Sequence, residues 1–408
     1  MTAALWRRRA ILLGWGLLAL SAVIYWYSAR DYSSGRPDFF YLARAFDQGK
    51  TWLDVRLGPW DVIPVDGRIY VPFAPFPAIV FMPLAAVFSP QTLDQWQTGI
   101  NATLAAIDVG LCWVLTGRLG VQRLRDRFFL VLLFGFSTVI WWVTTRGGVW
   151  HTGEIIATML TFGCLIELWG RRRPALIGLL AGAAFLTRAP LAFALPFYAL
   201  LLLERDGVEG PRVDDARLGP PGSTLPVRDW LVLGLAFGLS VAFFFWYNFV
   251  RFGSPLESGY GLATLPQFLE RQRELGLFSL QHVPMNLDYF LFHMPARIAD
   301  PPFFRPDGLG FSIFITSPGL LLAFFAPRTR RSAWLAGAAI AVLIPTLLYY
   351  GGGWVQYGYR YFLDSIPFVI ALCALAVAKA GSLSWFWRIV ILLGVAVNLG
   401  GVYWAYHL

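Results

Sequence analysis

The chain has 408 residues, 57% of them hydrophobic and 14% charged, against about 45–50% and about 25% in soluble domains. With a mean hydropathy of +0.58, this composition excludes an ordinary soluble domain and predicts an all-α polytopic membrane protein. The net charge of +9 does not indicate a nucleic-acid partner, because the arginines gather in short segments between apolar runs.

Apolar runs along the chain predict a bundle of about eleven transmembrane helices, since a span needs about 20 mostly apolar residues. Residues 174–203 are too long for one span, at about 45 Å for a single helix. Thr187-Arg188-Ala189-Pro190 interrupts them, which predicts two short helices that meet at Arg188. The expected spans are 10–29, 96–117, 127–144, 151–169, the two halves of 174–203, 229–250, 309–326, 332–350, 361–379 and 386–406.

The distribution of arginine predicts a multi-pass protein of the plasma or inner membrane with a cytoplasmic N-terminus. We expect one transmembrane half at 1–203, a cytoplasmic linker at 204–228 and a second half at 229–408. The two long loops, 30–95 and 251–308, then lie outside, so an active site is expected on the extracytoplasmic face.

Asp38 is the leading catalytic candidate in the first of these loops. Pro37 suits the first turn of a helix, and the aromatic residues that follow predict an amphipathic helix at the membrane interface. A carboxylate there either stabilises the helix N-terminus or acts as a general base. Asp31 and Asp61 compete for the same role. The proline-rich run 73–89 predicts a juxtamembrane or re-entrant helix.

Two acids lie within expected spans. Glu154 opens one of them, where a carboxylate either faces a cavity or serves the helix start, and His151 is its expected hydrogen-bond neighbour. Asp108 lies near mid-span and is expected to face the bundle interior, paired with a polar group.

Arg188 and Arg360 are the leading candidates for binding a phosphate. Each lies at an expected outer span end among glycines and aromatics, and guanidinium binds phosphate through several donors at once. The alternative is an arginine that extends to the membrane interface. Arg251 and Tyr260 form a similar but weaker pattern.

Several common signatures do not occur in the sequence. It has no P-loop, no dinucleotide-binding glycine pattern, no serine-nucleophile elbow and no clustered metal ligands. We therefore expect no required cofactor and no ATP-driven mechanism. A divalent metal is possible but is not indicated.

The order of these segments resembles the GT-C membrane glycosyltransferases, especially the protein mannosyltransferase and lipid A aminoarabinose transferase branch. The resemblance rests on Pro37-Asp38 after the first span, on the proline-rich segment 67–77, and on 177–190 with its Leu-Thr-Arg-Ala-Pro end. The chain departs from the branch in having Asp38-Phe39 where Asp-Glu is common. Its segment at 74–77 also lacks a lysine.

The resemblance implies transfer of a sugar from a polyprenyl-phosphate donor to a glycan, lipid or protein acceptor outside the membrane. Asp38 would be the base, Glu154 a second acid, and Arg188 the cation near the lipid phosphate. The reaction would be inverting. Two alternatives remain open: a transporter or flippase of lipid-linked sugars, and a non-catalytic protein of envelope polysaccharide assembly.

Overall fold

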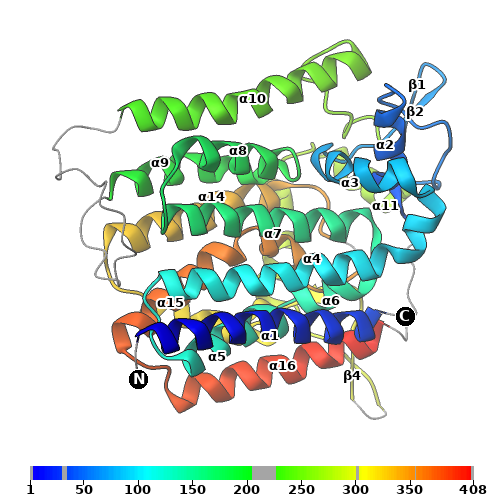
Figure 1. Cartoon of the computed structure of the whole chain (residues 1–408). Helices are drawn as coiled ribbons and strands as arrows, with labels where there is room; N and C mark the ends of the chain where they lie inside the picture. Colours follow the sequence, from blue (N-terminus) through cyan, green and yellow to red (C-terminus); the bar gives the residue numbers. More distant parts are fainter. Residues whose placement is uncertain (1–2, 30–34, 205–226, 300–302, 354, 406–408) are drawn as a thin grey trace.

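The computed structural model describes residues 3–29, 35–204, 227–299, 303–353 and 355–405. Most helices lie along one common axis of the molecule, and the two termini lie at opposite ends of the bundle (Figure 1). The predicted all-α class is confirmed, apart from short two-stranded pairings in the connecting segments. Most of the expected linker, at 205–226, lies outside the described residues.

Helices fill most of the first half of the chain. Its elements are α1 (Ala3–Ala29), α2 (Asp38–Asp47), β1 (Ile63–Val65), β2 (Arg68–Tyr70), α3 (Phe76–Val87), α4 (Pro90–Arg118), α5 (Leu124–Phe136), α6 (Ile140–Arg146), α7 (Gly148–Leu168), α8 (Pro174–Phe185), η1 (Ala189–Ala194) and α9 (Leu195–Leu203).

The second half contains four long helices and a region of short elements. Its elements are α10 (Val227–Phe252), α11 (Gln267–Arg273), η2 (Leu280–His282), α12 (Val283–Leu287), η3 (Asp288–Phe292), β3 (Ala296–Arg297), β4 (Phe304–Arg305), β5 (Leu309–Phe311), α13 (Ile313–Thr316), η4 (Pro318–Phe325), α14 (Arg330–Leu348), β6 (Gln356–Gly358), η5 (Arg360–Asp364), α15 (Ile366–Ala380) and α16 (Trp385–Ala405).

Among the described residues, six helices are long and apolar enough to cross a membrane: α1, α4, α7, α10, α14 and α16. The pair α5 and α6, bent by 44°, would make a seventh. Helical segments also occupy the other expected spans, but α8, η1 with α9, and α15 are shorter. The chain is thus a helical membrane protein, and the count of about eleven spans stays a prediction.

The break expected at Arg188 is present, and the chain reverses direction there. Arg172, just before α8, donates hydrogen bonds to the carbonyl oxygens of Leu201 and Glu204 at the end of α9, at 2.8 and 3.4 Å. At the break itself, just after α8, the carbonyl of Leu186 accepts a hydrogen bond from the backbone N–H of Phe76 at the start of α3. The prediction of two short helices is therefore confirmed.

The arginine-rich connections lie together at one end of the bundle, the end that carries the N-terminus in Figure 1. Arg331 donates to the carbonyl of Glu204, and Arg388 pairs with Asp126 at 3.0 Å. The helices α2 and α3 and the hairpin β1–β2 lie at the opposite end (Figure 1). We call these the basic end and the loop end. Which end lies in the cytoplasm stays a prediction.

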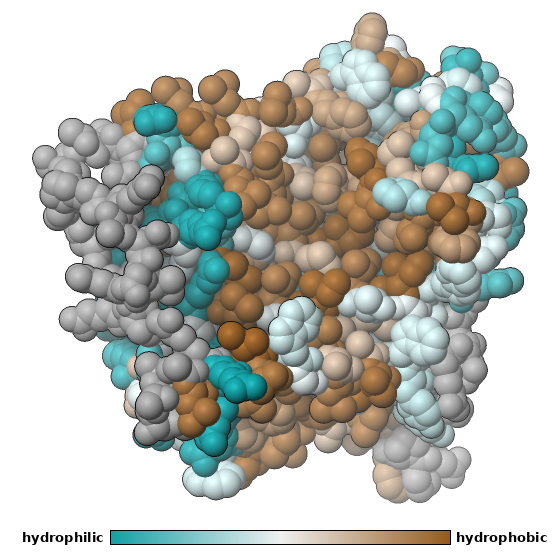
Figure 2. Space-filling view, viewed as in Figure 1, coloured by the Kyte–Doolittle hydropathy of each residue, from teal (hydrophilic) through white to brown (hydrophobic). Residues whose placement is uncertain are grey.

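Helix α10 packs on α8 at the edge of the bundle through small residues on α8. A Cβ on Gly178 would lie 2.5 Å from the carbonyl oxygen of Leu233, and one on Gly182 would overlap Ser240 Oγ. The backbones approach too closely there for larger side chains. Hydrophobic side chains occupy the middle of the face in Figure 2, and hydrophilic ones gather toward its ends, as a membrane protein requires.

The two long loops dock on each other at the loop end. The backbone N–H of Asp61 donates to the carbonyl of Thr264 at 2.8 Å, and the N–H of Thr264 donates to Val62 at 2.9 Å. The hairpin β1–β2 turns through Asp66-Gly67, both with positive φ, as a two-residue turn requires. The helix expected after Pro37 is α2, whose aromatic side chains pack on α3.

Candidate functional site

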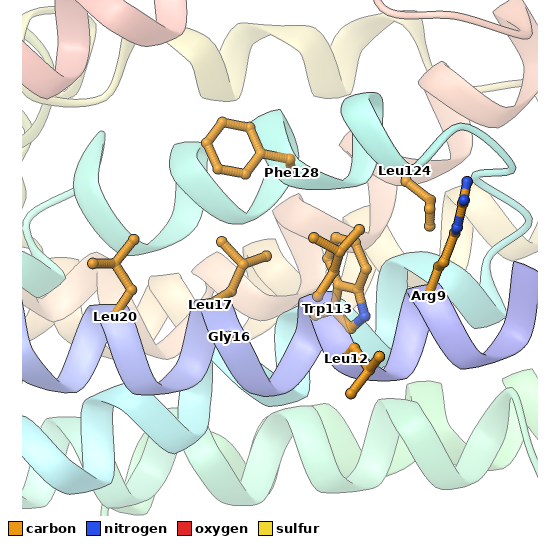
Figure 3. Close-up of a pocket in the computed structure, with 9 residues that line it drawn as sticks. Arg9, Leu12, Gly16, Leu17, Leu20, Trp113, Leu124 and Phe128 are labelled. Atoms are coloured by element: carbon orange, nitrogen blue, oxygen red, sulfur yellow. The ribbon is translucent and has the colours of Figure 1, made fainter.

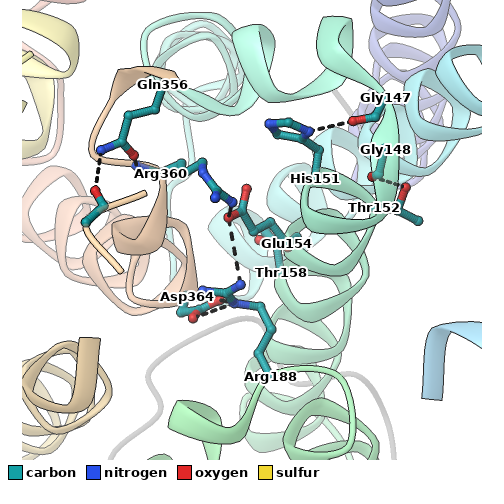
Figure 4. A network of polar contacts seen from close by, with 11 residues as sticks. Gly147, Gly148, His151, Thr152, Glu154, Thr158, Arg188, Gln356, Arg360 and Asp364 are labelled. Atoms are coloured by element: carbon teal, nitrogen blue, oxygen red, sulfur yellow. Dashed lines mark hydrogen bonds and ion pairs between the residues drawn. The ribbon is translucent and has the colours of Figure 1, made fainter. Parts of the chain in front are cut away.

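Four charged side chains from three distant segments meet at the loop end of α7 (Figure 4). The carboxylate of Glu154 accepts a hydrogen bond from Arg360 and lies 3.7 Å from Arg188 Nη1. Arg188 Nε lies 2.7 Å from both carboxylate oxygens of Asp364. We call Glu154, Arg188, Arg360 and Asp364 the charged cluster.

Local backbone features place each member of the charged cluster. A single residue, Gly147, separates α6 from α7, and its φ of 57° allows the sharp turn that brings Glu154 inward. Arg188 occupies the break between α8 and η1. The side chain of Gln356 accepts a hydrogen bond from the backbone N–H of Arg360 and donates to Leu309, which fixes the start of η5.

The charges of the cluster balance, which explains how they can be buried. Glu154 and Asp364 are 0% exposed and Arg360 is 6% exposed, and buried charges are stable only when paired. Arg188 is the most open member, with its side chain 17% exposed. Within the described residues, Glu154 Oε2 and Arg360 Nε have no hydrogen-bond partner. Both guanidinium groups also lie over the ring of Tyr361, within 5.3 Å.

A second group forms around Arg36 and contains Asp38. Arg36 Nη2 and Nε donate to the two oxygens of Asp38 at 2.8 and 3.0 Å. Its Nη1 lies 3.8 Å from Asp61, and its guanidinium stacks 4.9 Å from the ring centre of Trp150. The structure thus pairs Asp38 with the neighbouring Arg36, and no contact joins Asp38 to Arg188 or Arg360 among the described residues.

Asp61 connects the two groups electrostatically. Burial raises the pKa of Asp61 above its ordinary value, while the positive charges of Arg36 and Arg360 lower it. Burial lowers the pKa of Arg36, but the hydrogen bond and charge of Asp38 outweigh this effect and raise it. Because the positive charge of Arg360 acts on Asp61, the Arg36 group and the charged cluster belong to one polar region.

Other expected site residues have different surroundings. His151 donates from Nδ1 to the carbonyl of Gly147 at 2.5 Å, so the expectation that it neighbours Glu154 by a hydrogen bond is wrong. Arg251 donates to Val71 and Asn248 and so holds the two loops together. Asp31 lies outside the described residues.

Two further residues complete the comparison with the sequence. Asp108 is buried as expected, but neither of its oxygens has a hydrogen-bond partner in the described part of the chain, so its expected pairing is wrong. Tyr260 lies near the charged cluster, since the positive charge of Arg188 acts on its phenol. Burial raises the pKa of Tyr260 to about 12.

Sequence reasoning missed three members of this region: Arg36, Gln356 and Asp364. Asp364 stands at the start of an apolar run, directly before Ser365-Ile366-Pro367. This is the same signal that selected Glu154, and it could have been found. The role of Gln356 depends on the parallel pairing of β5 with β6, which no local pattern indicates.

No metal centre is evident in the part of the chain that the structure describes. No group of three or more His, Cys, Asp or Glu side chains there is arranged to hold a metal ion.

An apolar groove of about 550 Å³ lies toward the basic end, where α1 meets Trp113 of α4 and Leu124 and Phe128 of α5, with Arg9 at one end (Figure 3). None of its lining residues belongs to the charged cluster.

Comparison with known proteins adds little beyond this geometry. No family model and no curated protein matches the chain, so the branch suggested by sequence motifs stays a prediction. Two solved structures of oligosaccharyltransferases from Archaeoglobus fulgidus align with the chain over most of its length. One is tethered to an acceptor peptide with the NVT sequon, and the other, named AglB, is bound to an inhibitory peptide and a dolichol-phosphate.

The similarity to both structures is low. Each is 15% identical to this chain and covers 96% of it, with TM-scores of 0.45 and 0.47 respectively. The chain spans about half the length of each, 54% and 55%. Similarity at this level assigns no residue and no activity to the chain.

Proposed function

We propose that the chain is a GT-C membrane glycosyltransferase. It moves a sugar from a polyprenyl-phosphate donor to an acceptor hydroxyl on the extracytoplasmic face, with inversion at the anomeric carbon. The observation that carries the proposal is the charged cluster at the loop end, where two arginines from separate segments meet one buried carboxylate. The motif order from Pro37-Asp38 to Arg188 supports the same class.

Arg188 is the residue we assign to the donor phosphate. It is the most exposed member of the charged cluster, and its planar group can donate to a phosphate oxygen while Asp364 holds its Nε. Arg360, held in place by Glu154, adds a second positive charge next to it. Donors fixed before the reaction stabilise the negative charge that develops on the departing phosphate.

The first loop supplies the proton acceptor for the attacking hydroxyl in this proposal. The resemblance to GT-C enzymes gives that role to Asp38, and Asp61 is the alternative. Both carboxylates lie at Arg36, beside Trp150 and within the same polar region as Arg360. Inversion follows because one displacement joins acceptor oxygen and anomeric carbon while the bond to phosphate breaks.

The test is transfer by purified protein in proteoliposomes. The probes are polyprenyl-phosphate sugars, each carrying one radiolabelled hexose or pentose, with an extract of cell-envelope glycans, lipids and proteins as the acceptor mixture. We expect one donor to lose its label to the acceptor fraction and to leave polyprenyl phosphate. The Glu154→Gln variant should lose this transfer.

Two outcomes would overturn the proposed function. One is the absence of transfer with every donor by folded wild-type protein. The other is movement of intact labelled donor across the bilayer without transfer, which would favour a flippase.

A further inference from the structure

Asp38 is poorly placed to take a proton from an acceptor. Both of its carboxylate oxygens accept hydrogen bonds from Arg36, at 2.8 and 3.0 Å, in a two-point pairing. The residue is 1% exposed, at the start of α2. A general base needs an oxygen that an incoming hydroxyl can reach at hydrogen-bond distance, and Asp38 offers none here.

Asp61, in the same loop, has the accessibility that Asp38 lacks. Its side chain is 27% exposed, and its closest cation, Arg36 Nη1, lies 3.8 Å away, beyond ordinary hydrogen-bond distance. Asp38 is thus buried and paired at both oxygens, whereas Asp61 is partly exposed and has no ion pair closer than 3.8 Å. The two acids share Arg36 but differ in what can approach them.

The backbone of Asp61 is held in an uncommon conformation. Its φ is 54°, in the left-handed region, which non-glycine residues adopt rarely and aspartate more readily than most. The hydrogen bond from its N–H to the carbonyl of Thr264 fixes this conformation by tying the first loop to the second. The docking of the two loops therefore fixes the backbone at Asp61.

The groups that act on Asp61 come from several segments of the chain. The charged ones are Arg36 and Asp38 before and within α2, and Arg360 at the start of η5. Trp150 of α7 lies close enough to lower the pKa of the Asp61 carboxylate. The negative charge of Asp61 also acts on three phenols, those of Tyr260, Tyr350 and Tyr361.

We propose that Asp61, and not Asp38, is the catalytic residue that removes the proton from the acceptor hydroxyl. The inference rests on the proposed function. The acceptor O–H proton passes to the Asp61 carboxylate as the acceptor oxygen bonds to the anomeric carbon. The bond from that carbon to the phosphate oxygen breaks, and its electron pair leaves on polyprenyl phosphate. Asp38 positions Arg36, which in turn holds the ionised Asp61 next to the acceptor.

The electrostatics of Asp61 suit this role. Burial raises its pKa above the ordinary value, the positive charge of Arg36 lowers it, and the negative charge of Asp38 raises it again. A base with a raised pKa accepts a proton more readily. Burial raises the pKa of Tyr260 to about 12, so this neighbour stays a neutral hydrogen-bond donor.

The experiment compares three substitutions in one loop, using the labelled donor and acceptor mixture that the wild-type protein turns over. Asp61→Asn keeps the size of the side chain and tolerates positive φ. Asp38→Asn loosens Arg36. Asp66→Asn is the matched control, because Asp66 also has positive φ but is exposed in the β1–β2 turn. Glu replaces Asp61 in a fourth variant that retains a carboxylate.

We expect Asp61→Asn to reduce kcat by about 10²–10⁴-fold, the usual contribution of a general base. The acid limb of the wild-type pH–rate profile should disappear with it. Asp61→Glu should restore part of the rate and the acid limb. Asp38→Asn should reduce kcat less than Asp61→Asn does and should keep the acid limb of the pH–rate profile. Asp66→Asn should have the same kcat and the same profile as wild type. Thermal unfolding in detergent confirms that each variant is folded.

The outcomes separate this inference from the proposed function. If wild type transfers sugar and folded Asp61→Asn keeps both its rate and its acid limb, Asp61 is not the base and the transferase proposal stands. If instead Asp38→Asn removes the limb, the base is Asp38. If folded wild type transfers no sugar, both proposals fall together.

Discussion

The two ends of the bundle both contain buried ion pairs, and the Arg388–Asp126 pair at the basic end is more closed than the charged cluster at the loop end. At the basic end, Arg388 pairs with Asp126 at 3.0 Å, with side chains 4% and 1% exposed. At the loop end, the charged cluster includes Arg188, 17% exposed, and continues toward Asp61, 27% exposed. The chemistry of the pairs is the same, and access to them differs.

The difference shows that a buried ion pair by itself does not indicate a functional site. Arg388 also donates to the carbonyl of Leu383, so its guanidinium holds the turn before α16 to α5. The charged cluster instead joins α7, the α8–η1 break and η5, and exposes one guanidinium. Unpartnered atoms do not separate the two ends, because Asp126 Oδ2 and Arg388 Nε also lack a hydrogen-bond partner among the described residues. What separates them is the exposure of Arg188, which leaves its guanidinium open to a ligand.

The largest effect is expected when one partner of a buried ion pair is removed, at each end of the bundle in a separate variant. Replacing one partner of a buried pair leaves the other charge uncompensated and costs about 3–5 kcal/mol of stability. We expect both Glu154→Gln and Asp126→Asn to lower the free energy of unfolding. Only Glu154→Gln should reduce transfer per folded molecule, by about 10²-fold or more, because it removes the support of Arg360. The measurements are denaturant unfolding in detergent and donor turnover.

Equal turnover losses in the two variants, after correction for folded protein, would remove the contrast between the ends. The double variant Asp126→Leu with Arg388→Met is the control for stability. Apolar replacement of a complete buried pair is often neutral, so it should restore the unfolding free energy.

A smaller effect should follow from Arg188→Lys. Lysine keeps the positive charge but loses the planar group that binds Asp364 and a phosphate at once. We expect about a 10²-fold loss in kcat/KM for the donor, at the low end of the range for removal of one charge-stabilising donor. Kinetics over a range of donor concentrations measure this, and Arg331→Lys at the basic end serves as the control. Unchanged donor kinetics in Arg188→Lys would exclude Arg188 as a phosphate ligand.

Substitutions in the contact between α8 and α10 test the packing of helices away from both ends of the bundle. A leucine at Gly182 has to displace Ser240, since a Cβ alone would overlap its Oγ. Overpacking of this kind costs about 1–3 kcal/mol. Gly238→Ala on α10 is the control, because a Cβ there would have nothing within 4 Å of it. Detergent unfolding should show a loss for Gly182→Leu alone, and equal behaviour of both variants would contradict the close approach.

The smallest effect concerns pH and His293 in the second loop. Partial burial lowers the pKa of His293, but hydrogen bonds to Asp307 and Asp288 outweigh this and raise it above its ordinary 6.5. The pairing therefore adds stability below that ordinary value and loses it as pH rises through the raised value. Amide hydrogen exchange in residues 288–299 should speed up over this rise, beyond its intrinsic pH dependence. His293→Gln should remove the extra change, and its persistence there would assign it to another group.

Local sequence patterns located several elements but not the contacts between them. Proline and arginine at 187–190 predicted the break between α8 and η1, and Pro37 with its aromatic neighbours predicted α2. The meeting of Glu154 with Arg360 joins residues 206 positions apart, and the sequence could nominate both without placing them together. Asp38 was the leading catalytic candidate, but Arg36, only two residues away, pairs with both of its oxygens.

The most direct test of the transferase proposal is mass spectrometry of lipid-linked sugars and envelope glycans from cells that lack the gene. Our account predicts that one polyprenyl-phosphate sugar accumulates at the outer face while one glycan, lipid or protein loses that sugar. Expression of the Asp126→Asn variant in these cells should restore both the normal donor level and the sugar on the acceptor. Expression of Glu154→Gln should restore neither. Accumulation of the donor only at the inner face, or no change in either fraction, would contradict it.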